Sequence, residues 1–343
     1  MNIEGSVLKE LCDAFHFPIG NDPIILFAFR GCLPKHHEKN NTNHSNHFKS
    51  ADQLTRVPVN YLNPRCTIGI WDRITDKIAL FPGSTLPSKD YVKRHPSSVS
   101  ILNVLCPGSY QLRKGIHPRN EEGFQRHEAL LMDGFGIVGL PHIIKTSASI
   151  RFSSRIVNYD VVRPGDNLHA GRMEPTDKSY FSLLELKYSS CGCITVAGQP
   201  EEYLRYNRDH TAWNSWTTFI QILSRTQQKN FTFLLFNFDS CSRKSVSENK
   251  TIRYGSKQSA VGDIQYLLSN IVNTRTGQFY YSGDFDCSFS DQTAVSYFKF
   301  CKDYSSSKTE WEVQPQKFFN NTKHFMSLKI HPENAIQRSS TNY

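Results

Sequence analysis

Two residues whose types suit a thiol nucleophile and its base stand within residues 166–198. His169 is followed 24 positions later (193 minus 169) by Cys193, and Ser190 and Gly192 come just before the cysteine. A cysteine attacks a carbonyl as the thiolate, and its ordinary pKa of about 8.5 leaves little thiolate at neutral pH. A positioned imidazole remedies this. Gly192 leaves room for a carbonyl substrate, and small neighbours leave backbone N–H groups available to an oxyanion. The pattern therefore predicts a catalytic Cys193–His169 pair, with the Cys193 pKa lowered by an imidazolium.

Other interpretations of these residues stay open. Cysteine is among the most buried residue types, and an isolated histidine is commonly structural. A zinc site of Cys191, Cys193 and His169 ranks low, because Cys-x-Cys with a distant histidine lacks the paired spacing of structural zinc sites. His127 and His142 are backup candidates for the base. We expect no metal and no cofactor.

The residues around the pair resemble the L,D-transpeptidase catalytic-domain family. Over residues 56–197, the chain is similar to a divergent branch found in phage and bacterial wall-associated proteins, in which Asn-x-His precedes Ser-x-Gly-Cys. The matching segments are His169-Ala170-Gly171, Ser190-Cys191-Gly192-Cys193-Ile194 and, more loosely, Pro107-Gly108-Ser109-Tyr110.

This resemblance implies a mainly β catalytic domain with flanking helices. Cys193 would be the nucleophile and His169 the base. The resemblance also implies catalytic support from Ser190 and Gly192, and substrate contacts from Cys191, Gly171 and Asn167.

The chain departs from the family pattern at three positions. Cys191 stands where the family has a second histidine, Thr195 stands where it has arginine, and Ala170 intervenes before the glycine. These departures affect substrate binding. They keep open the alternative that the domain has lost its activity.

The segment from residue 252 to 305 has a different pattern. Apolar residues at helical spacing predict two short helices, the first over Val261 to Ile271 and the second around Thr293 to Phe298. The segment is similar to the small helical peptidoglycan-binding domain. That resemblance implies wall-binding roles for Tyr281 and Asp284.

The chain is predicted to be α+β and to contain two domains. We expect a cysteine domain over residues 1–238, a linker over 239–251, the helical domain over 252–305 and a tail over 306–343. Within the first domain, the patterns predict a helix that contains Val7 to Phe15 and stops before Pro18, a strand over Ile24 to Phe29, a hairpin over Cys66 to Phe81, a helix near Trp216 and a strand from Phe231. Glycines around residues 115 and 134–139 predict loops and short strands there.

Composition narrows the possible partners. The chain has 343 residues, a net charge of +9 and nine cysteines. The charge favours an anionic partner, but the basic residues are scattered, which argues against nucleic acid. The cysteines show no paired pattern, which is typical of a reduced, intracellular history. Neither a signal peptide nor a membrane span is visible, so we expect synthesis in the cytoplasm and action in the periplasm or cell wall after lysis or specialised secretion. The sequence does not indicate an oligomeric state.

Both resemblances point to peptidoglycan. The function predicted is a cysteine enzyme that acts on stem peptides by acyl transfer or hydrolysis and is anchored by a wall-binding module. The alternative is a catalytically inactive peptidoglycan-binding or structural protein of a phage or secretion system. The sequence does not separate transpeptidation from hydrolysis.

Overall fold

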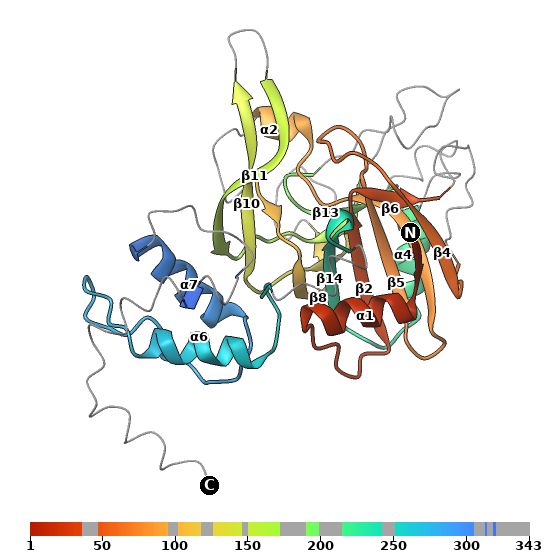
Figure 1. The fold of residues 1–343 in the computed structure, drawn as a ribbon. Helices are drawn as coiled ribbons and strands as arrows, with labels where there is room; N and C mark the ends of the chain where they lie inside the picture. The colour runs from red at the N-terminus through yellow and green to blue at the C-terminus, as the bar shows by residue number, and fades with distance from the viewer. Residues whose placement is uncertain are drawn as a thin grey trace.

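A closed barrel of eight strands forms the centre of the computed structural model (Figure 1). The structure describes residues 1–35, 47–94, 102–117, 126–145, 150–171, 190–198, 215–241, 251–304, 313 and 318–319. In spatial order the barrel strands are β12 (Leu168–Ala170), β13 (Ile194–Val196), β6 (Lys77–Ser84), β5 (Cys66–Asp72), β2 (Ile24–Arg30), β14 (Asn230–Asn237), β8 (Gly108–His117) and β9 (His127–Leu131). The predicted α+β class is confirmed.

Strand β2 is apolar from Ile24 to Phe29 because it is buried on both faces. Its alternate residues Leu26 and Ala28 pack inside the barrel, whereas Phe27 and Phe29 belong to a second apolar cluster outside it. Helix α1 (Gly5–Phe15) covers that outer face with Leu8, Leu11 and Phe15. Each fully buried side chain of this kind contributes about 1.5–3 kcal/mol to folding. The predicted first helix, first strand and β5–β6 hairpin are confirmed.

Two smaller sheets flank the barrel. One contains β1 (Asn2–Glu4), β4 (Ala51–Arg56) and β3 (Cys32–Pro34). The other contains β11 (Ile150–Val162), β10 (Gly136–Lys145) and β7 (Val104–Leu105). Further helices are α2 (Lys89–Arg94), α4 (Ser215–Ser224) and the 3₁₀ helix η2 (Phe238–Cys241). Helix α4 confirms the predicted helix near Trp216, and β14 confirms the predicted strand from Phe231.

The prediction of loops and short strands in the glycine-rich region holds for the five-residue strand β9 and is wrong for β8 and β10. Gly115 lies inside the ten-residue strand β8, and Gly136 begins the ten-residue strand β10. A Cβ on Gly115 would lie 2.4 Å from a methyl carbon of Leu131, and one on Gly136 would lie 2.9 Å from a methyl carbon of Leu105. These glycines therefore allow close packing of neighbouring side chains and do not break the strands.

Two helices form the C-terminal unit, α6 (Ser259–Ser269) and α7 (Asp291–Tyr304), as the periodicity predicts. This unit contacts the barrel directly. Tyr254 stacks on Tyr110 of β8 with ring centroids 5.0 Å apart, and the Ser256 hydroxyl donates to the carbonyl of Phe15 at 2.8 Å. Apolar residues of both parts belong to one buried cluster. Residues 242–250 of the predicted linker lie outside the described residues.

We expect a protease cut in residues 242–250 to leave two fragments that elute together in native size-exclusion chromatography, because the Tyr254–Tyr110 contact joins the parts. The substitution Tyr254→Ala removes that stack and should lower the free energy of unfolding by roughly 3 kcal/mol. Tyr266→Ala is the matched control, because Tyr266 is 56% exposed and should change stability little. Separation of the wild-type fragments in native buffer would contradict the expectation.

Candidate functional site

Two neighbouring strands bring His169 and Cys193 together. Strands β12 and β13 pair in parallel, with His169 opposite Thr195, and Cys193 immediately precedes β13. Side chains alternate along each strand, and Leu168, Ala170, Ile194 and Val196 face the apolar interior. His169 therefore lies on the opposite face of the sheet, which is also the face that Cys193 can reach.

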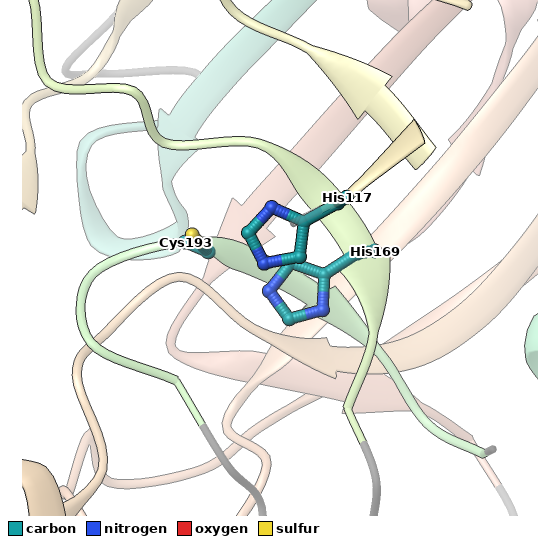
Figure 2. A group of neighbouring side chains, drawn as sticks. All are labelled: His117, His169 and Cys193. Carbon is teal, nitrogen blue, oxygen red and sulfur yellow. The ribbon is translucent and has the colours of Figure 1, made fainter. Parts of the chain in front are cut away.

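A third residue, His117 at the end of β8, completes the group. One ligand-type atom from each of His117, His169 and Cys193 lies within 4.8 Å of the others (Figure 2). The rings of His117 and His169 stack, with centroids 4.4 Å apart and planes 14° apart. His127 of β9 contacts both rings edge-on at 5.7 Å. The sequence interpretation did not assign His117 a role, and only the pairing of β8 with β9 places it here.

Hydrogen bonds orient both stacked imidazoles. His169 Nδ1 lies 2.7 Å from the carbonyl oxygen of Ala170, so this nitrogen carries the proton and donates it. The other nitrogen, Nε2, then has a lone pair and can accept a proton. His117 Nδ1 lies 3.0 Å from Nδ2 of Asn167. Asn167, predicted to contact substrate, is thus a hydrogen-bond partner of His117.

The turn before Cys193 requires glycine. Gly192 has a φ of +152°, and a Cβ there would lie 2.9 Å from the carbonyl oxygen of Asn103 and 3.0 Å from Oδ1 of Asp166. The Ser190 hydroxyl accepts a hydrogen bond from the Gly192 N–H at 3.1 Å and donates to the Cys193 carbonyl at 2.8 Å. Ser190 and Gly192 therefore shape the backbone that carries the sulfur.

The Cys193 thiol is protonated at neutral pH in this structure. Burial raises the pKa of Cys193 well above its usual range, and the nearby Asp166 and Cys191 raise it further. The expectation of a lowered pKa is therefore wrong, because the sequence does not reveal the loss of water around the sulfur. Cys191, predicted to contact substrate, is half-buried, and repulsion between the two sulfurs as thiolates contributes to the raised pKa of Cys193.

A buried carboxyl lies beside this thiol. Burial raises the pKa of Asp166 well above its usual range, and Arg30 opposes that shift. With its amide nitrogen turned towards Asp166, Asn103 donates to the two carboxyl oxygens at 3.1 and 2.6 Å. Asp166 thus interacts electrostatically with both Cys193 and Arg30, the last residue of β2.

Among the described residues, His117, His169 and Cys193 form the group whose atoms could hold a metal ion. The zinc set considered from sequence included Cys191, which is outside this group. The amide of Asn167 opposes metal binding through His117. Its Nδ2–H group already donates to Nδ1, whereas metal binding at Nε2 would require a proton on Nδ1.

The remaining predicted residues occupy other positions. The N–H of Gly171 donates to the Val196 carbonyl at 2.8 Å and extends the pairing of the two site strands. Tyr281 and Asp284 lie between α6 and α7, where the Tyr281 hydroxyl donates to the Asp284 carbonyl. Neither belongs to the group around Cys193 that the described residues form.

The chain was compared with known proteins. No protein-family model, curated protein or solved structure matches it. In the part of the chain that the structure describes, no helix combines the length and apolar character needed to cross a membrane. The arrangement of Cys193, His169 and His117 is therefore the main support for a functional hypothesis.

Proposed function

We propose that this chain is a cysteine enzyme of acyl transfer, with Cys193 as the nucleophile and His169 as the general base. One observation carries the proposal. A ring nitrogen of His169 lies within 4.8 Å of the Cys193 sulfur, and the hydrogen bond to Ala170 fixes the tautomer whose Nε2 can accept the thiol proton.

The raised pKa of Cys193 determines when the proton moves. Because the resting sulfur is protonated, its proton passes to His169 Nε2 as the sulfur attacks the carbonyl carbon. A carbon–sulfur bond forms and the carbonyl oxygen becomes an oxyanion. When the oxyanion collapses, the bond to the leaving amine breaks and His169 returns the proton to that amine. Water or a second amine then attacks the thioester and releases Cys193 as a thiol.

Stem peptides of peptidoglycan are the proposed substrate. The resemblance of the site strands to L,D-transpeptidase domains supports this choice, as does the net charge of +9, which favours an anionic wall polymer. On the C-terminal unit, Tyr266 and Phe285 are 56% and 46% exposed, with ring centroids 6.4 Å apart. Exposed aromatic rings of this kind suit contact with the apolar faces of sugars.

The alternative is a wall-binding protein without catalysis. The burial of Cys193 and its raised pKa favour this candidate, because both reduce the reactivity of the thiol. Thr195, at the family's arginine position, is fully buried in β13 and offers no positive charge.

Incubation of the full chain with purified sacculi tests the two candidates. We expect mass spectrometry to find cleaved or exchanged stem peptides, together with a thioester adduct on Cys193. We also expect the chain to sediment with sacculi, less so as salt rises, because salt screens charge attraction. Sedimentation without any product or adduct would favour the binding protein, and an adduct on another cysteine would contradict the assignment of Cys193.

A further inference from the structure

We propose that His117 is a further catalytic residue, the side chain that donates a hydrogen bond to the oxyanion formed when Cys193 attacks a carbonyl. The inference rests on the proposed function and assigns a role that the sequence interpretation gave to backbone N–H groups. It follows from the two histidines having opposite tautomers.

The amide of Asn167 determines the tautomer of His117. The backbone N–H of Met132 donates to Asn167 Oδ1 at 3.1 Å, and this bond identifies the oxygen side of the amide. The nitrogen side, Nδ2, therefore faces His117 Nδ1 at 3.0 Å. An amide nitrogen can only donate, so Nδ1 accepts and the proton of neutral His117 resides on Nε2.

His169 has the reverse arrangement. Its Nδ1 donates to the Ala170 carbonyl, so its Nε2 accepts. Figure 2 shows the two stacked rings beside Cys193. The group thus contains one proton acceptor and one N–H donor. This division of roles is what acyl transfer needs, because one group must remove the thiol proton while another stabilises negative oxygen.

The position of His117 suits an oxyanion. Donors that stabilise an oxyanion lie about 2.7–3.1 Å from it, and the oxygen is attached to the carbon that bonds to sulfur. One ring nitrogen of His117 lies within 4.8 Å of the sulfur, so the N–H of this ring is close enough to contact that oxygen. His117 is half-buried, whereas His169 and Cys193 are buried, so His117 is the member of the group that a substrate meets first.

The stacking keeps His117 neutral during the reaction. When His169 accepts the thiol proton it becomes positively charged, and its ring centroid is 4.4 Å from that of His117. A second positive charge at this distance is disfavoured. His117 consequently remains a donor through Nε2 and does not compete with His169 for the thiol proton.

The first experiment measures the tautomers by nitrogen NMR of the full chain labelled with ¹⁵N-histidine. His117→Gln and His169→Gln variants assign the signals. We expect the proton of neutral His117 on Nε2 and that of His169 on Nδ1. A proton on Nδ1 of His117 would overturn the proposal.

The second experiment compares two reactions of the same thiol at one pH. Acylation by p-nitrophenyl acetate forms an oxyanion, and alkylation by iodoacetamide forms none. Peptide mapping confirms reaction at Cys193 in both. His117→Phe preserves a stacked ring but lacks the N–H, and should slow acylation about 100-fold while alkylation changes only a few-fold. His117→Gln, whose amide supplies an N–H group, should recover part of the acylation rate.

His127→Phe is the matched control, because His127 contacts both rings but lies outside the three-residue group. It should leave the ratio of the two rates unchanged, and thermal melting checks that each variant folds. An unchanged ratio in His117→Phe would overturn the role of His117 alone. Failure of wild-type Cys193 to be acylated would instead overturn the proposed function, and with it this role.

Discussion

Cys193→Ala is expected to abolish the acyl adduct and to lower turnover of stem peptides by about a thousandfold or more, because Cys193 is the thiol that lies with His169 and His117. The barrel should remain folded, since the substitution removes one sulfur atom at the start of β13. Mass spectrometry of the intact chain, after incubation with sacculi, measures the adduct. Release of soluble peptides measures turnover.

Cys287→Ala is the control for this substitution. Cys287 is a half-buried thiol of the C-terminal unit, so its loss should leave both the adduct and the turnover close to wild type. An adduct that persists in Cys193→Ala would show that a different nucleophile acts. Loss of the adduct in both variants would indicate damage to the fold, and thermal melting would reveal it.

His169→Ala is expected to lower acylation at pH 7 by about 10²- to 10⁴-fold, the usual contribution of a general base. The pH dependence should change as well. In the wild type the imidazole removes the thiol proton, so acylation does not depend on prior ionisation of the thiol.

Without the imidazole, only thiol ionisation can supply the nucleophile. Burial raises the pKa of Cys193, so this thiol has a smaller thiolate fraction at neutral pH than an exposed cysteine has. The acylation rate of His169→Ala should therefore keep rising with pH into the alkaline range. Stopped-flow acylation between pH 5 and 10 measures both profiles. The control is His16→Asn, because His16 ends α1 with a φ of +55°, which asparagine tolerates. Superimposable profiles for wild type and His169→Ala would contradict the base assignment.

Much of the fold could be predicted where the pattern of apolar residues along the chain is clear. Helix α1 and strand β2 have clear apolar patterns, and both were predicted close to their observed ends. The full length of strands β8 and β10 was missed because glycine was interpreted as a break. In fact Gly115 and Gly136 make space for neighbouring leucines, and that space depends on strand pairing, which the local sequence does not contain.

Some residues of the candidate site could be predicted from the sequence and others could not. Cys193 and His169 could be found because they flank one segment and resemble a known motif. His117 comes from a strand far away in sequence, and only closure of the barrel brings β8 and β9 next to β12. The ionisation of Cys193 depends on burial and on Asp166, and both are properties of packing that the sequence does not contain.

The parallel pairing of β12 and β13 makes the geometry of the candidate site depend on closure of the barrel. The distance between base and nucleophile is determined by a hydrogen-bonded ladder, in which neighbouring strands lie about 4.8 Å apart. The ladder is held on one side by β9 and on the other by β6. A substitution in β6 or β9 that disturbs this pairing should therefore change the spacing of His169 and Cys193 without contacting either side chain.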